Sequence, residues 1–113
     1  MFAVIYRWRL HEGAEEQFAA GWHRVTRAMH RHCGSYGSRL HRADDGTWVA
    51  YARWPDAGAR EACPEVDPEG EAMMREAIAE SFPSLRCQVV DDLLAEPGRL
   101  PGPGPQTAPP DRS

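Results

Sequence analysis

The segment Phe2-Ala3-Val4-Ile5-Tyr6-Arg7-Trp8-Arg9-Leu10 decides the fold that we expect for this chain. It is rich in β-branched and aromatic residues, and its second half alternates between aromatic rings and arginine, which is the period-2 pattern of a β-strand. The alternation places apolar side chains on both faces of the strand, with Phe2, Val4, Tyr6 and Trp8 on one face and Ala3 and Ile5 on the other. Both faces of this strand therefore carry apolar groups.

A helix and a hairpin are predicted to follow this strand. Apolar residues recur at spacings of four, three and four, at Phe18, Trp22, Val25 and Met29, which predicts one stripe of a helix from about Ala14 to about His32. Two strand-like runs, Tyr36–Arg42 and Thr47–Trp54, then flank the turn Asp44-Asp45-Gly46. This arrangement is typical of a β-hairpin.

The second half of the body is expected to add a broken helix and one more strand. Pro55-Asp56 opens a helical start, the stretch from Pro64 to Pro68 breaks it, and a helix is predicted over Glu69–Phe82 before a strand over Leu85–Leu94. The order βαββαβ predicts an α+β protein of the ferredoxin-like class, with a four-stranded antiparallel sheet and both helices on one face.

The chain of 113 residues is expected to hold one domain, over residues 1–96. Residues 97–113 form a predicted disordered tail, because nine of these seventeen residues are proline or glycine and none is aromatic. The formal net charge of −4 argues against nucleic acid as the main partner. No apolar run approaches the roughly 20 residues that span a bilayer, so we expect no membrane association.

The uncovered sheet face predicts a homodimer. A sheet with helices on one side only would leave Val49, Tyr51 and their neighbours in water, and apolar patches of this kind usually mark an association surface. The odd number of cysteines, Cys33, Cys63 and Cys87, lacks Cys-x-x-Cys spacing and follows no signal peptide. These features predict three reduced thiols in a cytoplasmic protein, with neither a disulfide framework nor a zinc site.

The run Asp45-Gly46-Thr47-Trp48-Val49-Ala50-Tyr51-Ala52-Arg53-Trp54, together with Gln88-Val89-Val90-Asp91-Asp92-Leu93-Leu94, resembles the antibiotic biosynthesis monooxygenase family over residues 1 to 95. The resemblance implies a dimeric α/β-barrel fold. It does not by itself settle the activity, because the members differ. Some resemble cofactor-independent oxygenases that turn phenols into quinones, while others degrade haem, oxidise quinols or have no known activity.

Two positions match the quinone-forming members. Their tryptophan at the end of the third strand corresponds to Trp54, and an arginine on the last helix corresponds to Arg75 of Arg75-Glu76-Ala77. Two other positions depart from the pattern, since the family's asparagine is Ala50 and a tyrosine six residues beyond the tryptophan is Arg60. The haem-degrading members are less similar, because their strand-1 asparagine is Tyr6 here and no histidine follows His41.

The resemblance therefore implies a monooxygenase for a phenolic or quinol-type small aromatic molecule that needs no haem, flavin or metal. Its candidate catalytic residues are Arg75, Trp54 and His23, and its candidate substrate-binding residues are Tyr6, Trp8, Trp22, Met29 and Tyr51. A phenolate would need a cation, aromatic walls would orient its ring, and a histidine near neutrality could act as a base.

Each of these residues also has a structural interpretation. The aromatic residues could simply fill a core, and Arg75 could pair with Glu71 or Glu80 along its helix. His30 shares the helix flank of His23, so either histidine could serve as the general base. The alternative function is a non-catalytic dimeric protein of the same family that binds an aromatic metabolite.

Overall fold

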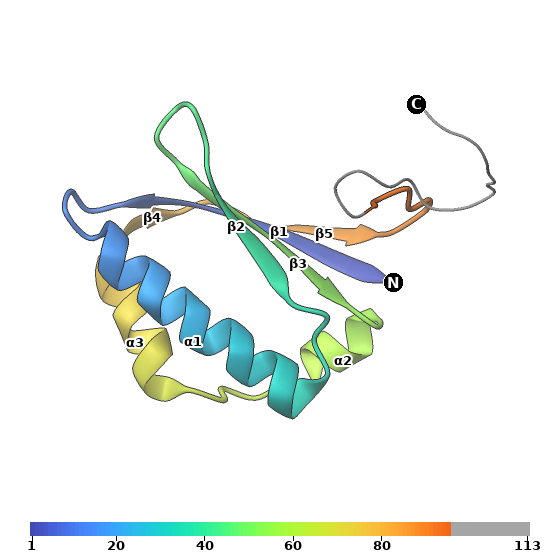
Figure 1. The fold of residues 1–113 in the computed structure, drawn as a ribbon. Helices are drawn as coiled ribbons and strands as arrows, with labels where there is room; N and C mark the ends of the chain where they lie inside the picture. The colour runs from blue at the N-terminus through green and yellow to red at the C-terminus, as the bar shows by residue number, and fades with distance from the viewer. Residues whose placement is uncertain (96–113) are drawn as a thin grey trace.

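The computed structural model describes residues 1–95, and the predicted tail over 97–113 lies outside the described residues. Eight elements follow one another along the chain: β1 Phe2–Leu10, α1 Glu15–Cys33, β2 Ser38–Arg42, β3 Trp48–Trp54, α2 Ala57–Glu61, α3 Pro68–Ala77, β4 Ile78–Ser81 and β5 Leu85–Gln88. The strands form one antiparallel sheet, and α1 and α3 pack side by side against one of its faces (Figure 1). The ferredoxin-like α+β fold predicted from the sequence is confirmed.

Strand β1 lies at the centre of the sheet, and its outer edge is shared by two short strands. The sheet order is β2-β3-β1-β4, and β5 pairs with β1 as well. Strand β4 pairs with the segment Trp8–Leu10, whereas β5 pairs with Phe2–Ile5. Together β4 and β5 take the place of the single fourth strand that the sequence predicted.

Two predicted element bounds in this region are wrong. The helix predicted to reach Phe82 ends at Ala77, where Ile78 takes an extended conformation and pairs with Leu10 of β1. The strand predicted to reach Leu94 ends at Gln88, the partner of Phe2. Because β1 begins at Phe2, the chain beyond this point has no strand left to pair with, and Val90, Leu93 and Leu94 are exposed.

The alternation along β1 divides the apolar residues between the two faces as predicted. On the helix-facing side, β1 contributes Phe2, Val4 and Trp8 to the buried core, and β3 contributes Ala50, Ala52 and Trp54. On the opposite face lie Ile5, Val49 and Tyr51, which are half-buried, and Leu85, which is 62% exposed. Within the described part of the chain no helix covers this open face (Figure 1).

Helices α1 and α3 approach each other closely at two glycines. A Cβ atom on Gly21 would stand 2.8 Å from the carbonyl oxygen of Gly70 and 2.9 Å from the Cβ of Met73. One turn later, Arg24 on α1 forms two hydrogen bonds to the carboxylate of Asp67, at 2.9 and 3.0 Å. Asp67 also caps α3, and the hydrogen bond from Arg24, followed by that from the backbone of Gly70, lowers its pKa.

Gly21→Ala tests this close approach. Alanine favours a helix over glycine by about 1 kcal/mol, but the backbone carbonyl of Gly70 cannot move aside without displacing α3. We expect Gly21→Ala to lower the free energy of unfolding by about 1–3 kcal/mol, the usual cost of overpacking, measured by urea titration. Ala20→Ser on the exposed side of α1 serves as the control, with a change below about 0.5 kcal/mol. An increase in stability in Gly21→Ala would contradict this helix packing.

Candidate functional site

Two buried clusters lie side by side between the sheet and the helices. The Trp8 cluster consists of Trp8, Phe18, Ala50 and Ala77 with the half-buried residues around them. The Trp54 cluster consists of Phe2, Val4 and Trp54, with Tyr6, Met29, Cys33, Ala57, Ala59 and Cys63 packed against them. Tyr6 belongs to the surroundings of both clusters, and its ring stacks on Trp8 with a centroid distance of 5.6 Å. Tyr6 therefore contacts both clusters, and we call its position the aromatic junction.

Arg60 of α2 places a cation on this junction. Its Nε and Nη2 atoms donate hydrogen bonds to the hydroxyl oxygen of Tyr6 at 3.2 and 2.9 Å. The guanidinium is half-buried, and within residues 1–95 no carboxylate lies within ion-pair distance of it. Because the phenol oxygen accepts both bonds from Arg60, its own hydrogen remains available to another acceptor. The pair thus presents hydrogen-bond donors and a positive charge beside the Trp54 cluster.

Two further polar atoms on the same side of the sheet have no partner within residues 1–95. They are Nε1 of Trp54, a residue that is 2% exposed, and Oγ of Ser38. Ser38 lies directly opposite Ala52, and Trp54 is two residues further along β3, so both residues border the small side chain of Ala52. A buried indole N–H without a partner carries a desolvation cost of about 1–3 kcal/mol, which an acceptor atom of a ligand would remove.

Apart from the Ser38 hydroxyl, which can both donate and accept, the polar groups at this place present hydrogen-bond donors. The indole N–H and the guanidinium can only donate, and the hydroxyl of Tyr6 is left as a donor by its contact with Arg60. The arrangement therefore suits a ligand that presents an acceptor or anionic oxygen on a flat aromatic body, and a phenolate has both properties.

The structure brings three of the predicted site residues together at this place: Tyr6, Met29 and Trp54. Trp8 and Trp22 belong to the neighbouring Trp8 cluster. Tyr51 lies on the open face of the sheet, because it alternates with Ala50 and Ala52. It does not share a face with the other predicted substrate-binding residues.

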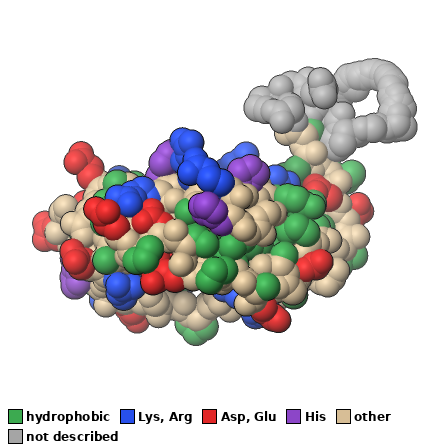
Figure 2. Space-filling view, turned by 90° about the horizontal axis from the view of Figure 1, so that it is seen from below, with side chains coloured by type: hydrophobic (Ala, Val, Ile, Leu, Met, Phe, Trp, Pro, Cys, Tyr) green, Lys and Arg blue, Asp and Glu red, His purple; other side chains and the backbone are tan. Residues whose placement is uncertain are grey.

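The two predicted catalytic residues outside the sheet lie on the surface of their helices. Arg75 is exposed on α3, while its neighbours Met74 and Ala77 point to the Trp8 cluster. Burial raises the pKa of Glu71, and the positive charge of Arg75 partly offsets this rise. Arg75 therefore interacts with a carboxylate of its own helix. His23 is exposed on α1, and Figure 2 shows histidine and arginine side chains gathered on that helix-covered side of the molecule. Both side chains lie at the surface, whereas Trp54 is 2% exposed.

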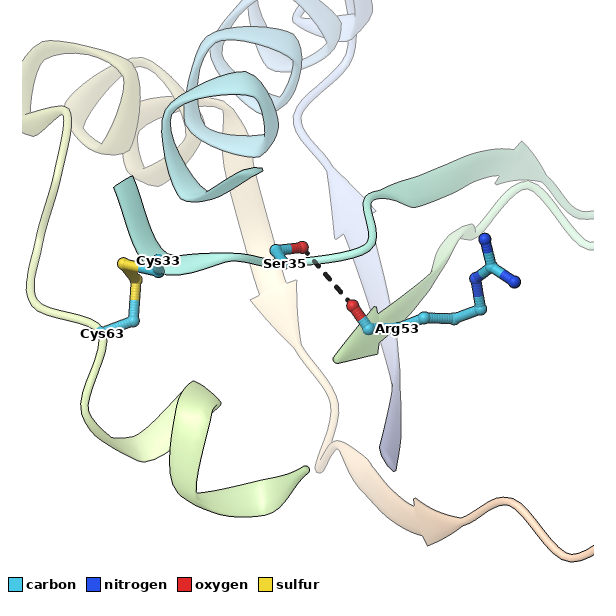
Figure 3. Close-up of a disulfide and its surroundings, with 4 residues drawn as sticks. All are labelled: Cys33, Ser35, Arg53 and Cys63. Atoms are coloured by element: carbon cyan, nitrogen blue, oxygen red, sulfur yellow. Dashed lines mark hydrogen bonds between the residues drawn. A yellow bond between two sulfur atoms is a disulfide. The ribbon is translucent and has the colours of Figure 1, made fainter. Parts of the chain in front are cut away.

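A disulfide joins Cys33 and Cys63 beside the Trp54 cluster, with the Cα atoms 5.5 Å apart (Figure 3). Both cysteines pack against the Trp54 cluster. The prediction of three reduced thiols is therefore wrong for two of them, and only Cys87 is free. The sequence interpretation failed because the fold brings together the end of α1 and the loop after α2, which are 30 residues apart in the sequence. A cytoplasmic location stays a prediction.

Sequence reasoning also missed Arg60 and Ser38. One feature of the sequence singles out Arg60, because it occupies the position of a tyrosine in the family that the sequence resembles. Its contact with Tyr6, however, depends on α2, which brings Arg60 back over the sheet. Within residues 1–95 no three histidine, cysteine or acidic side chains lie close enough together to bind a metal ion. The same part of the chain contains no helix that is long and apolar enough to cross a membrane.

The fold and the site together define a ferredoxin-like α+β domain with hydrogen-bond donors gathered beside the Trp54 cluster. The sequence profile of the family named antibiotic biosynthesis monooxygenase matches residues 1–62, and the chain belongs to this family. No curated protein sequence matches the chain significantly.

Solved structures share the fold at low sequence identity. Rv0793 from Mycobacterium tuberculosis is 18% identical with a TM-score of 0.65, and the match covers 80% of this chain and 96% of that protein. SnoaB, a cofactor-independent oxygenase from Streptomyces nogalater, is 22% identical with a TM-score of 0.67, covering 81% of this chain and 95% of that one.

Reduction of the disulfide tests its contribution to stability. A cross-link between residues separated by 30 positions restricts the unfolded chain, and the loop-closure entropy corresponds to about 3.5 kcal/mol. We expect dithiothreitol to lower the free energy of unfolding by about this amount in urea titrations, and Cys33→Ser with Cys63→Ser to do the same without reductant. Cys87→Ser is the matched control and should leave the value nearly unchanged. Three reactive thiols in the untreated native protein would contradict the disulfide.

Proposed function

We propose that the protein is a cofactor-independent monooxygenase that oxidises a phenolic or quinol-type aromatic molecule held between the sheet and α1, beside Trp54. The observation that carries the proposal is the Arg60–Tyr6 pair, a cation without a carboxylate partner within residues 1–95, next to a buried indole N–H that also lacks a partner. Family membership supports an oxygenase, and the named activity of SnoaB, on a similar fold, agrees with it.

The reaction needs a substrate that gives its own electrons to oxygen. A phenol that loses its proton to solvent becomes electron-rich enough to reduce O₂, and a proton is taken up again when water is released. Oxidation of the ring carbon opposite the hydroxyl consumes one O₂, inserts one oxygen atom to form a quinone and releases the other as water, so the substrate supplies all four electrons. The residues contribute by holding the phenolate. Arg60 and the Tyr6 hydroxyl would face its oxygen, and the Trp54 ring and N–H would orient the aromatic body.

We assign to Arg60 the role that the family resemblance implies for Arg75, because Arg60 is half-buried at the aromatic junction and Arg75 is exposed on α3. A buried phenolate gains from a nearby cation in a water-poor environment, where the interaction is screened less than at the surface. Tyr6 fixes the guanidinium by accepting two of its N–H groups, so the cation is oriented before the substrate binds.

One observation favours the second candidate, a non-catalytic protein that binds an aromatic metabolite. The position of the asparagine in the quinone-forming members is Ala50, which is 1% exposed and packs in the Trp8 cluster. A methyl group cannot donate the hydrogen bond of an amide, so this chain binds its ligand without that group.

Oxygen consumption by the purified, metal-chelated protein distinguishes the two candidates. With a panel of dihydroxynaphthalenes and anthrone-type phenols, we expect Arg60→Gln to lower the rate about a hundredfold, the usual effect of losing one preorganised anion stabiliser. Arg75→Gln is the matched control and should stay within about twofold. An equal loss in Arg75→Gln would return the role to Arg75, and no oxygen uptake with any phenol would favour the binding protein.

We also propose that two copies pack through their open sheet faces. Ile5, Val49 and Tyr51 form a half-buried apolar centre there, and Leu85 adds a largely exposed side chain beside Ile5. Light scattering after size exclusion should give about twice the chain mass of 12.6 kDa. Tyr51→Glu should produce monomers, whereas His32→Glu on the exposed side of α1 should not. A wild-type monomer at micromolar concentration would refute the dimer.

A further inference from the structure

The segment that carries Arg60 connects two fixed points, and we call residues 55–66 the strap. At one end, Trp54 is the last residue of β3 and is 2% exposed. At the other end, Asp67 caps α3 and receives two hydrogen bonds from Arg24. Helix α2 is the only regular element of the strap, and it is five residues long with none of them buried. A helix this short is not stable by itself.

Few non-covalent contacts hold the strap on the sheet. Ala57 and Ala59 contribute two small side chains to the surroundings of the Trp54 cluster. Glu61 pairs with Arg86 at 2.7 Å, but both side chains are about half exposed, at 61% and 45%, and such surface pairs contribute little. Arg60 adds its two hydrogen bonds to the hydroxyl of Tyr6. The covalent bond from Cys63 to Cys33 is therefore the strongest attachment between the ends of the strap.

The disulfide joins the strap to a rigid point. Cys33 is the last residue of α1, and the chain after it is fixed to β3: Tyr36 N–H donates to the carbonyl of Arg53 at 2.9 Å, and Ser35 Oγ donates to the same oxygen (Figure 3). Cys63 is three residues from Arg60, and its N–H donates to the Arg60 carbonyl at 3.2 Å. A fixed Cys63 thus holds the backbone of Arg60 in place.

We propose that the Cys33–Cys63 disulfide is a redox-responsive modification site whose state positions Arg60 on Tyr6. A dithiol, either a small molecule or a protein with two neighbouring thiols, reduces it. One thiolate attacks the sulfur of one cysteine, which breaks the protein S–S bond, forms a mixed disulfide and releases the other cysteine as a thiolate. The second thiol then attacks the reductant's own sulfur in the mixed disulfide and releases the first cysteine. Two electrons and two protons pass to the protein cysteines, and the dithiol ends as its own disulfide. Both cysteines are half-buried, so the reductant has partial access.

Reduction releases the strap between its two ends. Arg60 then leaves the Tyr6 hydroxyl, and the site loses its cation while the sheet and α1 stay folded. The oxidised protein accordingly binds anionic aromatic ligands, and the reduced protein binds them as weakly as neutral ones. The movement of the strap does not depend on the proposed oxygenase activity; only the consequence for turnover rests on it.

Hydrogen exchange tests the movement directly. The amides of Ala59, Ala62 and Cys63 are hydrogen-bonded within the strap, at 2.8, 2.9 and 3.2 Å. We expect dithiothreitol to speed their exchange at least tenfold while the amides of β1 and β3 exchange as before. Cys33→Ser with Cys63→Ser should exchange fast with or without reductant, and Cys87→Ser should behave like the wild type. Unchanged exchange of the strap upon reduction would overturn the proposal.

Ligand binding shows whether reduction acts through the position of Arg60 or through a general loosening of the binding site. The probes are 1-naphthoate, a permanent anion at neutral pH, and 1-naphthamide, its neutral isostere. We expect reduction to weaken naphthoate binding about tenfold and to leave naphthamide binding unchanged, and we expect neither effect in Arg60→Gln. Equal weakening of both probes, or a persistent effect on naphthoate in Arg60→Gln, would overturn the role of Arg60. Neither measurement involves turnover, so an inactive protein would not affect the result.

Discussion

The pairing of β1 with three other strands is the constraint on which the rest of the molecule depends. The strand is antiparallel to β3 along nearly its whole length and to β4 and β5 along its outer edge. A slip of one residue in this register would exchange the two faces and move the aromatic side chains of the interior into water. The register thus fixes which side chains α1 and α3 cover, and it fixes Tyr6 between the two clusters.

The site follows from small residues as much as from large ones. Ala50 and Ala52 on β3 face the helices beside Tyr6 and Val4. Because their side chains are short, the larger aromatic rings and the polar atoms next to them make up most of the surface at the site. The polar groups come from three different elements: Tyr6 from β1, Trp54 from β3 and Arg60 from α2. Because β3 and α2 are consecutive, a short turn after Trp54 suffices to bring the cation back over the sheet.

The sequence correctly predicted which faces of single strands and helices are buried, because those faces depend on periodicity within one element. The alternation in β1 and the stripe of Phe18 and Val25 in α1 gave the right faces, because period and burial are coupled within one element. Strand β4 was missed because Ile78 leaves the helix only to pair with Leu10, a tertiary contact that outweighs helix propensity. The disulfide and the Arg60–Tyr6 contact were missed for the same reason, since they join residues 30 and 54 positions apart.

The central claim is that the ligand binds on the helix-facing side of the sheet at Trp54, and the indole N–H signals test it most directly. The chain has four tryptophans, and each gives one ¹H–¹⁵N indole signal, that of Trp54 being the one missing in Trp54→Phe. Titration with 1-naphthoate should shift the Trp54 signal most, because its N–H has no partner within residues 1–95 and gains one from the ligand. Shifts confined to the other three tryptophans would contradict the site described for this protein.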